Sequence, residues 1–372
     1  MNRFVSVVAA TVGLTAIAVV GNCEHAWSAG KTRTYYIAAE ETTWDYAPAG
    51  RDLTMGMDFG EKANVFVARG PYRIGAKYKK VRYLEYTDAS FTQRKVRPPQ
   101  WRHLGILGPI IHAEVGDKIR VVFRNKASRP YSIHPHGVFY TKANEGAPTN
   151  DETPAADRAD DAVAPGTTYT YQWDVPPRAG PGPNDPSSVV WPYHSHTDSV
   201  RDSNSGLIGA IIVTRAGAAK ADGTPADVDR EFVTLFEIFD ENVSWYLDHN
   251  IAALPGKPAK FDRDNADFVE SNKMHSINGY VFGSMPMPKM KVGEHVRWYL
   301  FALGNEVDLH TPHWHGNTVV VGGYRRDTVS LLPATTIVAD MVPDDPGIWM
   351  FHCHVNDHIN AGMTARYQVT GK

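Results

Sequence analysis

Two similar stretches, EVGDKIRVVFRN at residues 114–125 and KVGEHVRWYLFA at residues 291–302, decide the fold. Each begins with a short Val-Gly turn and continues in the β-branched, aromatic and alternating pattern of a strand. Three more pairs follow in the same order: PGTTYTYQWDVP (165–176) with PATTIVADMVP (333–343), YHSH (193–196) with FHCH (351–354), and NSGLIG (204–209) with NAGMTA (360–365). The chain therefore contains two copies of one β unit.

The rest of the chain predicts an all-β protein. Short alternating strands recur between turn residues, 31 Gly and 25 Pro punctuate them, and no long helical periodicity is present. A small, polar, Pro- and Gly-containing segment, AGAAKADGTPADV at 216–228, separates the copies. We expect two β-sandwich domains of one type, at 32–217 and 228–372.

The N-terminus predicts a secretory signal peptide over residues 1–28. Arg3 supplies a positive start, residues 4–20 are apolar, and Ala-Trp-Ser at 26–28 is a plausible cleavage site. The apolar run is short for a membrane anchor, and the Asn before Cys23 makes a poor lipoprotein site. Cleavage removes Cys23 and leaves Cys353 without an intramolecular partner, so we expect an exported protein, periplasmic or secreted, with a lone thiol used for chemistry.

The charge composition argues against nucleic acid as a partner. Lys and Arg total 38 against 41 Asp and Glu, a net charge of −3, so no nucleic-acid footprint is present. No segment after the N-terminus is apolar enough to cross a membrane, and we expect no membrane partner.

Ten of the sixteen histidines fall in four short clusters. On a strand, the two rings of His-x-His point to one face, and imidazole suits copper, zinc or iron. One such pair is often structural, but four pairs together indicate a multi-metal site whose metal the histidines alone leave open. The clusters are HPHG (His134, His136), HSH (His194, His196), HTPHWH (His310, His313, His315) and HCHVNDH (His352, His354, His358).

The segment FHCHVNDHINAGM, residues 351–363, narrows the metal. Cys353, His358 and Met363 follow one another at intervals of five residues and offer thiolate, imidazole and thioether. With His310, they make the His₂Cys and axial Met set of a blue-copper electron-transfer site. Met363 alone could be a core methionine; the spacing argues for a ligand.

These motifs resemble those of the multicopper oxidases, especially ceruloplasmin and the A domains of coagulation factors V and VIII. The resemblance covers nearly all of the chain after the signal peptide. It implies two cupredoxin-like Greek-key β-sandwich domains. It is carried by YYIAAEETTWDYAP (35–48), KANEGA (142–147), HSHTDSVRDSNSGLIGAIIV (194–213), ESNKMHSINGYVFG (270–283) and GNEVDLHTPHWHG (304–316).

The resemblance implies four coppers per subunit. It assigns the type 1 copper to His310, Cys353, His358 and Met363, the type 2 copper to His134 and His313, and the type 3 pair to His136, His194, His196, His315, His352 and His354. The internal repeat places Ser195 opposite Cys353, Tyr131 opposite His310 and Leu207 opposite Met363, so we expect no type 1 copper in the first domain.

The implied reaction is one-electron oxidation of a reductant at the type 1 copper, with O₂ reduced to water at the other three. Fe(II) is the favoured reductant, through Glu270, His275 and Asp357, while laccase-like oxidation of phenols stays open. Glu145, nine residues after His136, is a candidate proton relay. A copper nitrite reductase fits less well, because it lacks the type 3 histidines and keeps its blue copper in the first domain.

Two further expectations concern assembly and calcium. A two-domain chain can copy the six-domain ring of ceruloplasmin by closing a homotrimer, with copper clusters between subunits. The acidic loop at 142–163 resembles a family calcium loop, with Lys142 (through its carbonyl), Asp157, Asp160 and Asp161 as candidate ligands. An ordinary solvated acidic loop is the alternative.

Overall fold

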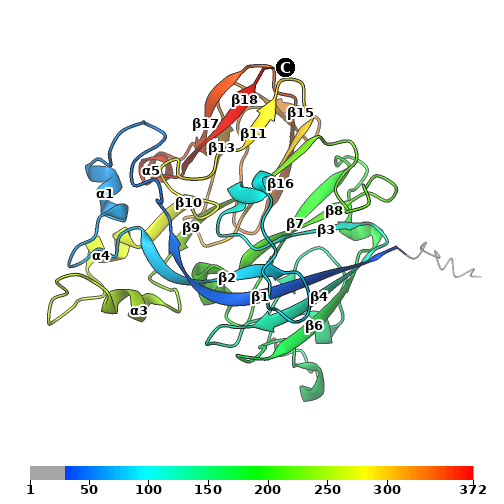
Figure 1. Cartoon of the computed structure of the whole chain (residues 1–372), viewed down its shortest axis with the longest axis horizontal. Coiled ribbons are helices and arrows are strands. Elements are labelled where there is room, and N and C mark those ends of the chain that lie inside the picture. Colours follow the sequence, from blue (N-terminus) through cyan, green and yellow to red (C-terminus); the bar gives the residue numbers. More distant parts are fainter. Residues whose placement is uncertain (1–29, 372) are drawn as a thin grey trace, which may run out of the picture.

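The computed structural model describes residues 30–371, and β-strands dominate it (Figure 1). The expected signal peptide lies outside the described residues. The all-β prediction is confirmed, because within these residues eighteen strands form four sheets and the helices have at most seven residues. Within the described part of the chain, no helix has the length and apolarity needed to cross a membrane.

The first half of the chain forms two four-stranded sheets that face each other. The core between them contains Val121, Phe123, Tyr171 and Ile211, all with no exposed surface. One sheet has the order β2 (Lys77–Tyr86), β1 (Thr32–Asp45), β4 (Lys118–Asn125), β6 (Thr168–Asp174); the other has β3 (Ile110–Glu114), β8 (Ile208–Thr214), β7 (Ser188–His194), β5 (His134–Pro135).

The second half repeats this topology. One sheet has the order β10 (Lys273–Ile277), β9 (Arg230–Asp240), β12 (Val296–Ala302), β16 (Thr336–Met341), β14 (Val319–Val321), β15 (Tyr324–Arg326); the other has β11 (Lys289–Lys291), β18 (Thr364–Thr370), β17 (Gly347–Cys353), β13 (Pro312–Trp314). Strand β9 runs parallel to β12 as β1 does to β4, and β11 runs parallel to β18 as β3 does to β8. The strand order of the first half therefore recurs in the second, which adds β14 and β15 at one sheet edge.

Short helices join the strands. The α-helices are α1 (Glu61–Val67), α2 (Ser199–Ser205), α3 (Leu247–Ala252), α4 (Ala266–Ser271) and α5 (Asn356–Asn360); the 3₁₀ turns are η1 (Pro99–Leu104), η2 (Lys142–Asn144), η3 (Ala155–Asp157) and η4 (Pro177–Ala179). Helices α1, α3 and α4 gather at one side of the molecule (Figure 1). Helix α2 begins directly after the HSH motif, where Asp198 caps it, and α5 begins directly after FHCH.

The two halves share a buried seam. Apolar residues of both halves, among them Leu107, Ile212 and Leu235, form one continuous core. A salt bridge with no exposed surface also crosses the seam, from Lys80 on β2 to Glu241 just after β9. The buried seam therefore fixes the orientation of the two halves relative to each other, and with it the orientation of their histidine clusters.

Candidate metal centres

The repeat brings the sequence-predicted cysteine and two histidines together at one end of the second sandwich. Cys353 ends β17, His310 lies two residues before β13, and His358 lies on α5. Their ligand atoms are mutually close: Nδ1 of His310 and Nδ1 of His358 are 3.1 Å apart, and the Cys353 Sγ lies 3.9 Å from the first and 3.6 Å from the second. All three residues are buried.

This triangle has the size of a metal coordination plane. Two imidazole nitrogens and a sulfur at ordinary bond lengths around one ion lie about 3.5–3.8 Å apart in trigonal geometry. Met363 is fully buried in the same core, and its carbonyl accepts a hydrogen bond from the Cys353 N–H at 3.1 Å. The residues therefore fit a His₂Cys copper site with a methionine at hand.

Hydrogen bonds orient these ligands. The His310 Nε2–H donates to Asp308 Oδ1 at 3.2 Å, which leaves Nδ1 free to face Cys353. Burial lowers the pKa of His358 to about 4, so its ring is neutral at pH 7 and can act as a ligand. Burial also raises the pKa of the Cys353 thiol, so without a metal this cysteine would stay protonated.

A second cluster follows from the pairing of β13 with β17. The register places His313 opposite His352, and His315 and His354 lie beside them. Nε2 of His352 is 3.0 Å from Nε2 of His315 and 3.2 Å from Nδ1 of His313. Because the His352 Nδ1–H donates to the Cys353 carbonyl at 2.8 Å, its Nε2 carries a lone pair toward the other rings. A shared metal ion is the natural partner of such converging lone pairs.

A third cluster has the same construction in the first half. Strand β5 pairs with β7 so that His134 lies opposite His194, and the rings of His136 and His196 complete the group. Nε2 of His136 and Nε2 of His194 are 3.1 Å apart. The His194 Nδ1–H donates to the Ser195 carbonyl at 3.0 Å, as His352 does to Cys353. Burial lowers the pKa of His136 to about 4 and that of His194 to about 3.

The first half has a serine where the second half has its thiol. Ser195 N–H donates to the Leu207 carbonyl as Cys353 does to Met363. Ser132 N–H, next to Tyr131, donates to the Ser195 Oγ. These hydrogen bonds place Ser195, Tyr131 and Leu207 at the positions of Cys353, His310 and Met363. A hydroxyl, a phenol and an aliphatic side chain offer no soft-metal site.

The two four-histidine clusters are not joined within one chain. Over residues 30–371, no hydrogen bond or aromatic contact connects a ring of His134, His136, His194 or His196 with a ring of His313, His315, His352 or His354. Each cluster offers its free nitrogens on its own half of the molecule.

Of the three residues expected to bind iron beside the type 1 site, His275 and Asp357 lie next to His358, whereas Glu270 is hydrogen-bonded to neither of them within residues 30–371. His275 on β10 is buried, its ring lies 5.2 Å from that of His358, and burial lowers its pKa to about 3. Asp357 is exposed on α5 beside His358. Glu270 is half exposed at the end of α4 and pairs with Lys273 at 3.3 Å; in the described chain, no hydrogen bond or ion pair links it to His275 or Asp357.

Glu145 and the acidic loop lie beside the first-half cluster. The Glu145 carbonyl accepts from His134 Nδ1 at 2.7 Å, while its carboxylate pairs with Lys142 at 2.7 Å. Asp160 is fully buried, with Oδ2 accepting from the Gly146 N–H, and its Oδ1 has no hydrogen-bond partner. Burial and then the charge of Asp160 raise the pKa of Asp161 to about 6. An orphaned buried carboxylate oxygen is the feature that a bound cation would satisfy.

Two buried carboxylates near His310 were missed from the sequence. Asp308 accepts from His310 and from the Ile238 N–H at 2.7 Å, and Glu237 on β9 accepts from the Leu303 N–H at 3.0 Å. Burial and the nearby Asp308 raise the pKa of Glu237 well above its ordinary value. The position of Asp308, two residues before the candidate ligand His310, is a sequence signal that could have identified it. The sequence around Glu237 contains no comparable signal.

Both halves of this chain are similar in sequence to known proteins. Two family models described as multicopper oxidase match residues 85–217 and 254–372. Among curated relatives, the human ferroxidase HEPHL1 is 48% identical over 341 residues, human ceruloplasmin 46% over 345, and human hephaestin 44% over 344. These alignments cover 91–92% of this chain but only 29–32% of each relative, so the chain spans less than a third of their length.

Solved structures share the fold. A multicopper oxidase crystal structure superposes with a TM-score of 0.57 at 20% identity, covering 91% of this chain and 89% of the other. The blue copper oxidase of Nitrosomonas europaea gives a TM-score of 0.56 at 18% identity, covering 91% and 86%.

Proposed function

Because this chain belongs to the multicopper oxidase family and is therefore an oxidoreductase, we propose that it is a ferroxidase that couples Fe(II) oxidation to the four-electron reduction of O₂ to water. The observation that carries the proposal is the buried triangle of His310, Cys353 and His358, with His352 and His354 bonded directly to the cysteine. When bound, copper supplies one-electron acceptance at that triangle and O₂ reduction at the histidine clusters.

Each copper has its own proposed set of protein ligands. His310, Cys353, His358 and Met363 hold the type 1 copper; Asp308 orients His310. The peptide and side-chain bonds of Cys353 form a continuous covalent path to His352 and His354. The type 2 copper takes His134 and His313, and the type 3 pair takes His136, His194, His196, His315, His352 and His354.

The proposed iron site lies beside His358. His275 is already in ring contact with His358, and Asp357 lies one residue before it. Carboxylates are hard ligands that favour Fe(III) over Fe(II), so they ease electron loss. Glu270 would have to leave Lys273 to join them. The name of one relative, the human ferroxidase HEPHL1, supports iron ahead of phenols as the reductant.

A homotrimer completes the clusters. Each chain offers four histidines on each half, and the two sets are not in contact within the described chain. A cyclic arrangement that sets the first half of one chain against the second half of the next would join them. Sedimentation of the copper-loaded protein tests this: a trimer is expected, and a fully metallated active monomer would refute it.

Two supporting roles are proposed for the loop beside the first cluster. Glu145 relays protons toward the clusters, since its own carbonyl contacts His134.

Calcium binds Asp160, Asp161, Asp157 and the Lys142 carbonyl, and it satisfies the orphaned Asp160 oxygen. If EGTA treatment changes neither calcium content nor melting temperature, there is no calcium site. Export through residues 1–28 is also part of the proposal.

The substrate is tested by the double variant Glu270→Ala with Asp357→Ala. An iron site predicts a large loss of Fe(II) oxidation, while phenol oxidation and the blue absorption are kept. Equal loss on both substrates would mean general damage to the type 1 site. Unchanged Fe(II) oxidation would show that Glu270 and Asp357 do not form the iron site.

A further inference from the structure

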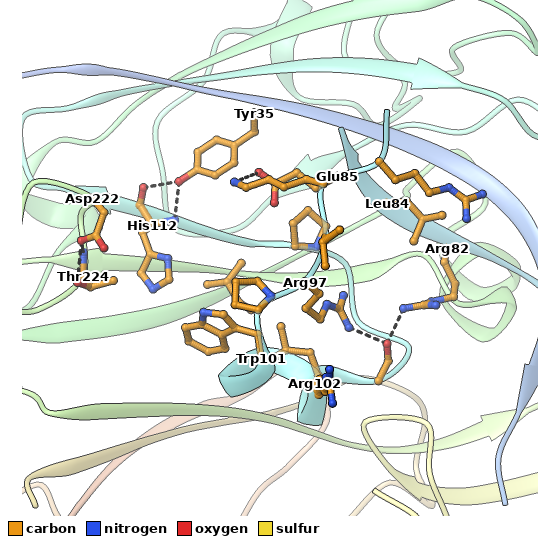
Figure 2. A pocket seen from close by; sticks show the side chains of 18 of the residues that line it. Tyr35, Arg82, Leu84, Glu85, Arg97, Trp101, Arg102, His112, Asp222 and Thr224 are labelled. Atoms are coloured by element: carbon orange, nitrogen blue, oxygen red, sulfur yellow. Dashed lines mark hydrogen bonds and ion pairs between the residues drawn. The ribbon is translucent and has the colours of Figure 1, made fainter. Parts of the chain in front are cut away.

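A cavity of about 550 Å³ opens at the seam between the two halves, away from the residues assigned to copper (Figure 2). Its walls come from β1, β2, β3, the segment before η1, η1 itself, the linker residues Asp222 and Thr224, and the turn at Tyr280 in the second half. Pockets at the junction of two structural units are common places for ligands.

Two arginines converge on one carbonyl in this cavity. The guanidinium groups of Arg82 and Arg97 both donate to the Gly105 carbonyl, and Figure 2 shows them approaching it from two sides. Arg82 also donates to the Ile106 carbonyl at 3.1 Å, and Arg97 to the Leu107 carbonyl at 2.6 Å. Backbone carbonyls hold both side chains in place, so their positions are fixed before any ligand arrives.

Gly105 makes this arrangement possible. Its φ of 52° lies in the left-handed region, and a Cβ there would come within 2.3 Å of the Asn278 carbonyl oxygen. Only glycine allows η1 to end this close to the second half while its carbonyl points toward the two arginines.

Neither arginine of the pair has a direct carboxylate partner in the described chain. Throughout residues 30–371, no carboxylate lies within 4 Å of a guanidinium nitrogen of Arg82, Arg97 or Arg102. Burial, followed by the charge of Arg97, lowers the pKa of Arg82 to about 9, and burial also lowers the pKa of Arg97. Two half-buried like charges on one acceptor are unfavourable, and an anion between them would offset that cost.

The acidic residues of the cavity are already engaged. Glu85 pairs with Lys95 at 2.7 Å, and Asp222 accepts from Thr224 at 2.7 Å. Flat apolar walls stand beside the arginines: the Arg82 guanidinium lies 4.8 Å from the Trp44 ring, and Trp101 lines the same cavity. The space thus offers positive charge at one end and aromatic surface next to it.

We propose that this cavity binds a small oxyanion, a carboxylate or phosphate, through Arg82 and Arg97, with Arg102 at its exposed rim. The carbonyls take Nε and Nη2 of Arg82 and Nη1 and Nη2 of Arg97, which leaves Nη1 of Arg82 and Nε of Arg97 to donate charge-assisted hydrogen bonds to such a group. The volume leaves room for an organic body against Trp101. The site contains no proposed copper ligand, so it stands or falls independently of the oxidase chemistry.

The test is calorimetric titration of the copper-loaded protein with citrate and, separately, with inorganic phosphate. Saturable binding of either is expected, and the stronger of the two identifies the carboxylate or the phosphate as the preferred group. Arg97→Gln removes a charged donor fork and should raise the Kd about 10- to 100-fold. Arg102→Gln, on an exposed residue that does not threaten folding, should raise it about threefold.

Arg69→Gln is the matched control, because Arg69 also donates to a backbone carbonyl, that of Ala253, but lies outside the cavity. It should bind both probes as the wild type does. The proposal is overturned if neither probe binds saturably to the wild type, or if Arg97→Gln, Arg102→Gln and Arg69→Gln all bind like the wild type.

Discussion

Replacing Asp308 by alanine should damage both stability and the type 1 site. Asp308 is fully buried, and its two oxygens accept from the Ile238 N–H at 2.7 Å, the Asn305 N–H at 3.0 Å and the His310 Nε2–H at 3.2 Å. Each buried donor left without an acceptor costs about 1–3 kcal/mol. The loss of a negative charge near Glu237 offsets part of that cost. The expected net destabilisation is about 2–4 kcal/mol.

The assay is urea unfolding of the copper-free protein, followed by tryptophan fluorescence, with the visible spectrum of the copper-loaded protein as a second readout. Asp308→Asn is the control: its amide oxygen keeps one acceptor, so about 1 kcal/mol is expected. In the alanine variant His310 loses the partner that fixes its free nitrogen, so the blue absorption should shift or weaken. An alanine variant within about 0.5 kcal/mol of wild type and with an unchanged spectrum would refute the role given to Asp308.

Three other changes have defined outcomes. Cys353→Ser should abolish the intense blue absorption of the copper-loaded protein while copper at the histidine clusters is kept; a variant that stays blue would disprove the ligand assignment. Lys80→Met leaves Glu241 buried and unpaired, so urea unfolding should show a loss of about 3–5 kcal/mol, most of it restored when Glu241→Leu is added; no loss would show that the seam pair is unimportant. Because burial lowers the pKa of His194 to about 3 and of His352 to about 4, the unfolded chain binds more protons between roughly pH 4 and 6.5. Copper-free protein should therefore lose stability as the pH falls through that window, and a melting temperature that is flat or rises there would contradict the burial of these rings.

The candidate copper ligands could be predicted from the sequence because they depend on two local features. These are the residue types themselves and the two-residue period of strands. His-x-His places both rings on one face wherever a strand forms, and the repeat of strands was visible in matched segments such as 114–125 and 291–302. The pairing register of β13 with β17 then sets His313 against His352.

Features that depend on packing between distant segments could not be predicted in this way. Glu237 reaches the His310 region only because β9 packs against the turn that carries Asp308. Arg82 and Arg97 meet only through the carbonyl of Gly105, and their sequence neighbours give no sign of it. The position of Glu270 relative to Asp357 likewise depends on how α4 packs against α1 and β10, which no local pattern encodes.

The most direct test of the central claim is simultaneous measurement of O₂ consumption and Fe(III) formation by the copper-loaded protein. A ferroxidase that reduces O₂ fully to water uses one O₂ for every four Fe(II) oxidised and releases no hydrogen peroxide. We expect that ratio in the wild type and no O₂ consumption in Cys353→Ser. Fe(II)-dependent O₂ uptake that survives in Cys353→Ser, or a wild type that consumes O₂ with phenols but not with Fe(II), would contradict the account.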